Sequence, residues 1–174
     1  MLGNPQWTNA ELRVLDWVHD RTSPPAVSLA RAVTLAGETP VVWAVVGTSC
    51  LVRTGARERW ASPLITLAVA TAVRHVLAER IARPRPPRRL WRASWSGPSF
   101  PSRHTALGSL GIALTAANLL PRPGPAAAAG AAAIGISRIV LGVHWPSDVL
   151  GGWAFAATAL AVSRGARRGN RDRR

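Results

Sequence analysis

Five uncharged stretches follow one another through most of this sequence. They cover residues 39–52, 60–73, 105–121, 123–137 and 149–163, and none contains Asp, Glu, Lys or Arg. Each is shorter than the ~18 to 20 apolar residues that mark a membrane-spanning helix by themselves. A soluble helical bundle would instead carry charged outer faces at a period of 3.6 residues, which these stretches lack. The pattern therefore predicts an all-α, multi-pass membrane helical bundle with about five transmembrane segments; a soluble bundle of buried helices is the alternative.

Composition supports a membrane location. The net charge is +14, and every basic side chain is Arg, so this charge persists at any biological pH. Eight Trp accompany only two Phe, and the apolar ring and N–H donor of Trp suit the boundary between lipid and water. The alternative is eight ordinary core tryptophans. At 174 residues the chain has room for a single domain.

The N-terminal region differs from the apolar core. Residues 1–24 and 25–37 have the spacing of amphipathic helices, the first expected to end at Pro24 and the second at Gly37. The pattern of a secretory signal peptide is absent, so we expect both helices in the mature protein. We predict three parts: N-terminal interfacial helices at 1–38, a membrane-embedded core at 39–163 and a basic disordered tail at 164–174.

A proline-rich segment separates the second and third uncharged stretches. Between Arg80 and Arg103 the repeated Pro, Gly and Ser prevent regular helix and predict a long functional loop. Arg residues in short loops tend to stay in the cytoplasm. This tendency assigns to the cytoplasm a first loop with Arg53, Arg57 and Arg59, a second with Arg122, and the C-terminal tail. The long loop and the turn around His144 then share the non-cytoplasmic face.

Three polar clusters converge on that face. They are RPRP at 83–86, FPSRHT at 100–105 and SRIVLGVHWPSD at 137–148. A phosphate ester requires cations and N–H donors around its oxygens, an in-line nucleophile, and an acid for the leaving oxygen. Taken singly, each His could be a structural residue. Together, the clusters contain all three of these chemical requirements.

The clusters resemble the signatures of the type-2 phosphatidic acid phosphatase superfamily, which includes membrane lipid phosphatases and vanadium haloperoxidases. The third signature is Ser-Arg, five residues, His, three residues and Asp. It is matched in full by Ser137, Arg138, His144 and Asp148.

The other two signatures are matched in part. Of Pro-Ser-Gly-His the chain has Pro101, Ser102 and His104, with Arg103 in the place of Gly. Of Lys, six residues and Arg-Pro, the chain has Arg85 and Pro86, but Ala78 stands where the Lys is expected. The candidates to replace that cation are Arg74, Arg80 and Arg83.

The resemblance and the chemistry of the side chains agree on roles. His144 is the expected nucleophile that forms a phosphohistidine, and Asp148 is expected to hold the other ring nitrogen. His104 is expected to protonate the departing alcohol and then to activate water. Ser102 is the expected N-cap of a helix whose first N–H groups bind anions. The predicted phosphate-binding residues are Arg85, Ser102, Arg103 and Arg138.

The predicted function is metal-independent hydrolysis of a lipid-linked phosphate monoester or pyrophosphate at the non-cytoplasmic membrane surface. No cofactor or metal is expected, because Cys ligands are absent and carboxylates are few. The expected partners are the lipid-linked substrate and membrane lipids, with no nucleic acid.

The sequence leaves three alternative functions. A catalytically weakened membrane scaffold or lipid-binding protein would account for Ala78. A vanadate-dependent haloperoxidase would use the same anion clamp, although such proteins are generally larger and soluble. Nucleic-acid binding through the Arg-rich tail lacks base-stacking aromatics near the tail.

Overall fold

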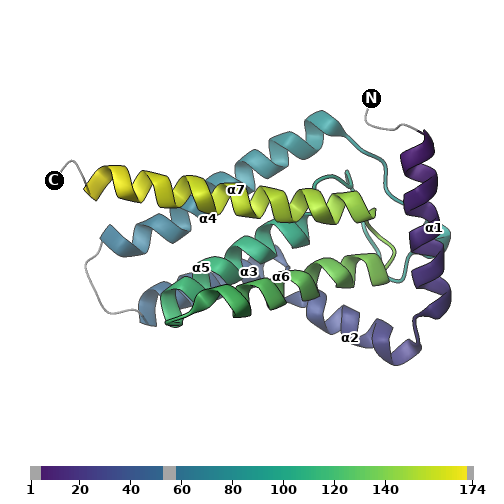
Figure 1. Ribbon diagram of the computed structural model, residues 1–174, viewed down its shortest axis with the longest axis horizontal. Coiled ribbons are helices and arrows are strands. Elements are labelled where there is room, and N and C mark those ends of the chain that lie inside the picture. The colour runs from purple at the N-terminus through teal and green to yellow at the C-terminus, as the bar shows by residue number, and fades with distance from the viewer. Residues whose placement is uncertain (1–4, 53–57, 172–174) are drawn as a thin grey trace.

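The computed structural model describes residues 5–52 and 58–171, and within these ranges every regular element is a helix (Figure 1). This confirms the all-α prediction. The helices are α1 (Pro5–Arg21), α2 (Pro24–Leu35), α3 (Thr39–Val52), α4 (Glu58–Ile81), α5 (Ser109–Leu119), α6 (Pro123–Val140) and α7 (Pro146–Arg171), with a 3-10 turn η1 (Arg88–Leu90) and a π-helical turn η2 (His104–Gly108).

The helix boundaries follow the uncharged stretches and the prolines. α3 coincides with the stretch 39–52, and the stretches 60–73, 123–137 and 149–163 lie within α4, α6 and α7. The stretch 105–121 covers η2 and α5 and continues two residues past Leu119. Prolines begin α2, α6 and α7, where the missing N–H has no intrahelical partner to lose. Pro24 was expected to end the first helix; instead it opens α2, after α1 has ended at Arg21. α2 ends at Leu35, just before the expected Gly37.

The C-terminal tail and the first expected cytoplasmic loop are the next two predictions to compare with the structure. Residues 164–171 continue α7 instead of forming a disordered tail, because Ala and Arg favour helix and no Pro interrupts them. Residues 172–174, and Arg53 and Arg57 of the expected cytoplasmic loop, lie outside the described residues.

Helix length and apolarity bear on how this chain could cross a membrane. Among the described residues, no helix taken alone combines the length and apolarity needed to cross a membrane, whereas α2 and α3 meet the criterion as a pair bent by 54°. The number of spans stays a prediction.

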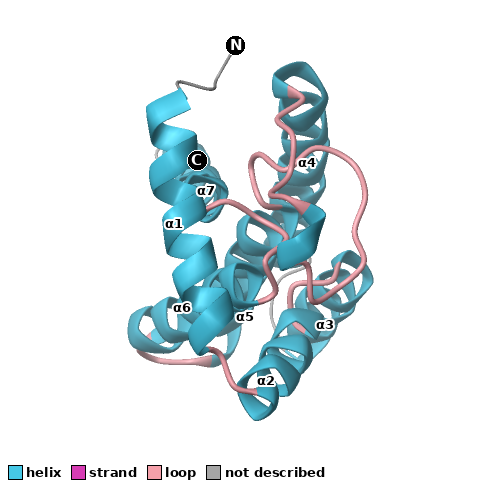
Figure 2. Cartoon of the chain, turned by 90° about the vertical axis from the view of Figure 1, so that its right-hand side faces the viewer, coloured by secondary structure: helices cyan, strands magenta, loops and turns pink. Residues whose placement is uncertain are grey.

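Helices α3 to α7 run roughly along the long axis of the molecule (Figure 1). The end of α3, the start of α4, the α5–α6 turn and the C-terminal end of α7 lie at one end of the bundle. Figure 2 looks at the opposite end, where α1 crosses and the loops gather. The core between these ends contains the fully buried side chains of Val46, Leu67, Leu107 and Leu110. The two long connections, 82–103 and 141–145, therefore meet at the α1 end.

Candidate active site

The predicted site residues come together at the α1 end of the bundle. His104 begins the η2 turn, Arg138 lies in the last turn of α6, and His144 and Asp148 flank the start of α7. His104, His144 and Asp148 are fully buried and Arg138 is nearly so. Buried polar and charged groups are costly unless they have partners, so their contacts define the site.

His144 and Asp148 form the expected pair. Oδ2 of Asp148 lies 3.4 Å from Nδ1 of His144 and accepts the Trp145 backbone N–H at 2.9 Å. On the other side of the ring, Nη1 of Arg85 lies 3.1 Å from Nε2 of His144. A guanidinium can only donate, so Nε2 carries the lone pair and Nδ1 carries the proton toward Asp148. This is the tautomer that a nucleophilic histidine requires.

The turn that carries His144 depends on a glycine. Gly142 has φ +66°, a conformation that L side chains rarely adopt, and a Cβ there would collide with the Leu90 carbonyl. The close approach lets Arg92 donate its backbone N–H to the Leu141 carbonyl at 3.0 Å. The long loop and the His144 turn are thus fixed against each other.

Arg85 is anchored by the long loop and by the His144 turn. It donates to the carbonyls of Val143 at 2.7 Å, Gly97 at 2.9 Å and Pro98 at 3.0 Å. Burial lowers the pKa of Arg85 to about 10, so the side chain remains charged at neutral pH. Arg85, a predicted phosphate-binding residue, is therefore held directly beside Nε2 of His144.

Several buried donors at the site make no hydrogen bond within the part of the chain that the structure describes. These donors are Nε and Nη2 of Arg138 and Nε of Arg103; both ring nitrogens of His104 are buried without a hydrogen bond as well. Nη1, the remaining donor atom of Arg138, donates a hydrogen bond to Thr34 Oγ1 at 2.6 Å. Buried donors are normally satisfied, so this group marks a place suited to an anion.

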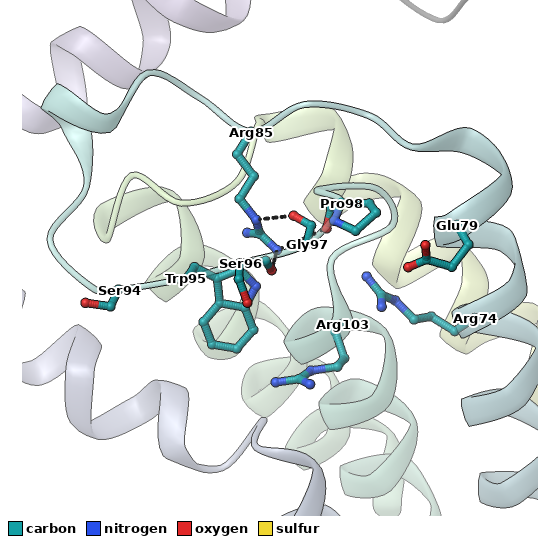
Figure 3. A pocket seen from close by; sticks show the side chains of 9 residues that line it. All are labelled: Arg74, Glu79, Arg85, Ser94, Trp95, Ser96, Gly97, Pro98 and Arg103. Carbon is teal, nitrogen blue, oxygen red and sulfur yellow. Dashed lines mark hydrogen bonds between the residues drawn. The ribbon is translucent and has the colours of Figure 1, made fainter.

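Trp95 lies among these cations. The guanidinium carbons of Arg103, Arg138 and Arg85 lie 4.9, 5.0 and 5.4 Å from its ring centroid. The ring also meets that of His104 edge to face, with centroids 4.8 Å apart. Stacking of this kind holds guanidinium planes in fixed orientations. Figure 3 shows Trp95 beside Arg85 and Arg103 at the cavity.

A cavity of about 520 Å³ opens over this cluster (Figure 3). Among its lining side chains are three cations from α4, the long loop and the η2 helix start, namely Arg74, Arg85 and Arg103. Arg74 is buried and donates to the Pro101 carbonyl at 2.7 Å. Arg103, where the family signature has Gly, adds a charge to the cavity wall.

The three candidates to replace the Lys absent at Ala78 are now distinguished. Arg80 is exposed at the end of α4. Arg83 binds Asp148 Oδ1 at 2.7 Å, Glu11 Oε2 at 2.7 Å and Ser147 Oγ at 2.6 Å. Of the three, Arg74 alone lines the cavity with Arg85.

Ser102 stands at the predicted helix start. Its Oγ accepts the Thr105 N–H at 3.4 Å and the Thr105 hydroxyl at 3.0 Å, and its own N–H donates to the Asp148 carbonyl at 3.1 Å. The contact from the Thr105 N–H is of the kind that a helix cap makes, and the phosphate-binding role of Ser102 stays a prediction. The hydrogen bond to Asp148 also joins this helix start to α7.

Burial sets the protonation of the two imidazoles. It lowers the pKa of His144 well below the ordinary value of 6.5, with Arg85 and Arg138 acting in the same direction. It also lowers the pKa of His104 to about 2, again with help from neighbouring cations. Burial raises the pKa of Asp148, and Arg83 opposes this rise. A neutral His144 is consistent with a nucleophile.

Sequence analysis missed several residues that contact the site. Thr34 and Glu38 come from the α2–α3 region, Glu11 comes from α1, and Trp95 comes from the long loop. One signal was available: Glu38 is the only acidic residue between Asp20 and Glu58. Among the described residues, no three His, Cys, Asp or Glu side chains are grouped as a metal site requires.

Comparison with known proteins identifies the family. The model of the PAP2 superfamily matches residues 59–171, a segment that contains all seven predicted site residues. The chain belongs to the PAP2 superfamily. The resemblance of the three motifs is thereby confirmed.

Two solved structures share the fold of this chain. One is a transmembrane PAP2-type phosphatidylglycerolphosphate phosphatase from Bacillus subtilis, with a TM-score of 0.84 and 22% identity, covering 97% of this chain and 89% of that one. The other is LpxE from Aquifex aeolicus, with a TM-score of 0.74 and 20% identity, covering 88% and 94%.

One curated relative is similar over a shorter length. It is an acid phosphatase from Zymomonas mobilis subsp. mobilis (strain ATCC 31821 / ZM4 / CP4), 39% identical over 67 residues. The match covers 38% of this chain and 25% of that protein.

Proposed function

We propose that this PAP2 protein hydrolyses a lipid-linked phosphate monoester or pyrophosphate without a metal, through a phosphohistidine on His144. The observation that carries the proposal is the juxtaposition of an anion-binding cluster with a correctly protonated nucleophile. Unpaired donors of Arg138 and Arg103 lie around the same Trp95 ring as Arg85, which contacts Nε2 of His144.

The first half-reaction transfers the phosphoryl group to the enzyme. Arg85, Arg103, Arg138 and Arg74 neutralise the phosphate oxygens, and the N–H groups at the helix start capped by Ser102 add neutral donors. The lone pair on Nε2 of His144 forms the N–P bond as the P–O bond to the leaving alcohol breaks. His104 gives its proton to that oxygen.

The second half-reaction regenerates the enzyme. His104, now neutral, accepts a proton from water as the water oxygen attacks phosphorus, and the N–P bond breaks to release inorganic phosphate. Asp148 stabilises the positive imidazole ring of His144 in the intermediate, through the contact at Nδ1. No step in this sequence requires a metal ion.

A lipid substrate in a membrane is supported by the outer surface of the bundle. Large apolar side chains on four helices are more than half exposed, which is costly in water but favourable in lipid. Examples are Leu51 on α3, Val69 on α4, Ile136 on α6, and Leu150 and Val162 on α7. Both structural neighbours are of the PAP2 fold, and one is a transmembrane phosphatidylglycerolphosphate phosphatase. The resemblance suggests phosphatidic acid, phosphatidylglycerol phosphate and polyprenyl pyrophosphates as substrates to test.

We place the site on the non-cytoplasmic face and the C-terminus in the cytoplasm. Arg122 and the end of α7 lie at the end of the bundle opposite the site (Figure 1). Short basic loops favour the cytoplasm. Labelling of single cysteines placed at each end in sealed vesicles tests this orientation.

The activity is tested by measuring phosphate release from a panel of lipid phosphates in detergent with EDTA. We expect release by the wild type and at least a ~10³-fold loss in His144→Ala, because the proposed N–P bond forms on His144. His75→Ala is the matched control, since His75 is exposed on α4. A label transferred from ³²P-substrate should be acid-labile and alkali-stable and should map to His144.

The alternative is a catalytically weakened scaffold of the same fold. It is favoured by Ala78, which is fully buried where the signature has Lys. Retained lipid-phosphate binding without phosphate release by the wild type would support this alternative and reject hydrolysis.

A further inference from the structure

The break between α2 and α3 lies directly against His104. Residues 36–38 separate the two helices, which are bent by 54°. A Cβ at Gly37 would lie 3.0 Å from Cβ of His104, and a Cβ at Gly108 would lie 3.0 Å from Cα of Gly37. The backbone of the break can approach the η2 turn this closely because both positions are glycine.

The next residue in the break contacts two site residues. Oε1 of Glu38 lies 3.1 Å from Nε2 of His104, at ion-pair distance but without hydrogen-bond geometry, and Oε2 lies 3.6 Å from Nη2 of Arg103. His104 is fully buried, whereas about a third of the Glu38 side chain is exposed (33%). Glu38 thus reaches from the rim of the site to the buried imidazole.

Glu38 lies outside both kinds of sequence evidence for the site. It belongs to none of the three motifs, and the family match begins only at residue 59. It lies at the break in the α2–α3 pair, in a region otherwise without acidic residues from 21 to 57.

We infer that Glu38 is a positioning residue for His104: its carboxylate lies beside Nε2 of the ring, favours the protonated imidazole and leaves Nδ1 available to the leaving-group oxygen. This inference rests on the proposed hydrolytic function, in which His104 is the acid and then the base. The site would then contain two imidazole–carboxylate pairs, His144 with Asp148 and His104 with Glu38.

The charges around His104 explain why such a residue is useful. Burial lowers the pKa of His104 to about 2, and every neighbouring cation lowers it further. An acid must carry a proton before it can donate one, so negative charge is needed near the ring. The substrate phosphate supplies part of it and the Glu38 carboxylate supplies the rest. The groups facing His104 are Glu38 from the α2–α3 break, Arg103 from its own element, Arg138 from α6, Arg85 from the long loop and His144 from the turn before α7.

Glu38 takes no proton in this scheme. The proton moves from Nδ1 of His104 to the leaving oxygen in the first half-reaction. It is replaced from the attacking water in the second. The carboxylate acts through its charge and through the orientation of the ring.

The test is the pH profile of kcat for Glu38→Gln, which removes the charge but keeps the shape. Loss of the carboxylate disfavours the protonated ring, so the alkaline limb of kcat should move to lower pH by about one unit. At pH 8 we expect kcat to fall about tenfold with KM changed less than threefold, because general acid catalysis contributes ~10²–10⁴-fold in all. Asp16→Asn is the control, since it removes an exposed carboxylate that pairs with Arg89 instead.

A double-mutant cycle separates positioning from a structural role. If Glu38 acts through His104, Glu38→Gln should lower kcat less than twofold in a His104→Ala background. An unshifted alkaline limb, or the same tenfold loss with and without His104, would overturn the inference. If Glu38→Gln is too unstable to assay, Glu38→Asp replaces it. This variant keeps the charge and should keep the limb while losing kcat, and a shifted limb would again reject the inference.

The same measurements distinguish this inference from the proposed function. Failure of the Glu38 inference leaves wild-type hydrolysis and the His144→Ala loss unchanged. Failure of the proposed function appears as wild-type protein that releases no phosphate, or as full activity in His144→Ala.

Discussion

Replacing Arg83 with methionine should cost both stability and activity, because it leaves a buried carboxylate without its cation. Arg83 is 13% exposed and its partner Asp148 is fully buried, with 2.7 Å between Nη1 and Oδ1. Breaking a buried pair by removing one partner costs ~3–5 kcal/mol. We expect the lower value, about 3 kcal/mol, because Asp148 keeps the Trp145 N–H. Methionine fills a similar volume, so little of this cost comes from a cavity.

The expected shift in unfolding temperature follows from the size of the protein. One kcal/mol corresponds to about 2–4 °C for 150–250 residues, so Arg83→Met should unfold about 6–12 °C below the wild type. The pH dependence of phosphate release should also shift in a defined direction. Arg83 opposes the burial that raises the pKa of Asp148, so its removal raises that pKa further and moves the acid limb of phosphate release to higher pH.

The matched control is Arg89→Met. Arg89 pairs with Asp16 at 2.7 Å, but both side chains are exposed, at 58% and 37%. Solvent screens exposed pairs, which therefore add little to stability, so this variant should unfold close to the wild-type temperature. Thermal unfolding in detergent and the pH dependence of phosphate release measure both effects. Equal unfolding temperatures for the two variants, or an unmoved acid limb in Arg83→Met, would refute the reasoning.

Two further predictions follow from the site. Arg74→Ala should lower kcat/KM about tenfold or more, since a charge-assisted hydrogen bond contributes ~1.5–3 kcal/mol, and Arg74→Lys should recover part of the loss. Steady-state kinetics with a lipid phosphate measures both effects. An unchanged kcat/KM in Arg74→Ala would exclude Arg74 as the replacement cation. The kcat/KM of the wild type should not fall as pH drops through the ordinary His value of 6.5, because the pKa of His144 lies well below it and the nucleophile stays neutral. A fall centred near pH 6.5 would contradict the burial of His144.

The parts of the site that could be predicted from sequence are those fixed by short-range spacing. Ser137, Arg138, His144 and Asp148 lie within one helix end, one turn and one helix start, so their order in sequence fixes their neighbourhood in space. Pro146 begins α7 and Asp148 lies in its first turn, four residues from His144. A short sequence motif is therefore enough to predict this part of the site.

The residues that sequence analysis missed depend on packing between distant elements. Glu38 meets His104 only because glycines at 37 and 108 let the α2–α3 break approach the η2 turn. Arg83 belongs to the RPRP motif, yet it binds Asp148 and Glu11 because α1 crosses the end of the bundle. Pro24 is compatible both with the end of one helix and with the start of the next, and packing of the neighbouring residues determines which occurs. None of these contacts leaves a periodic or spaced signal in the sequence.

The central claim is that His104 and His144 act on one phosphorus atom within an arginine cluster. A structure of the protein with bound vanadate, a phosphate-shaped anion, tests this claim most directly. We expect vanadium bonded to Nε2 of His144, its oxygens within hydrogen-bond distance of Arg85 and Arg138, and the His104 ring contacting the oxygen opposite His144. Vanadate bound away from His144, or a His104 ring that contacts no vanadate oxygen, would contradict it.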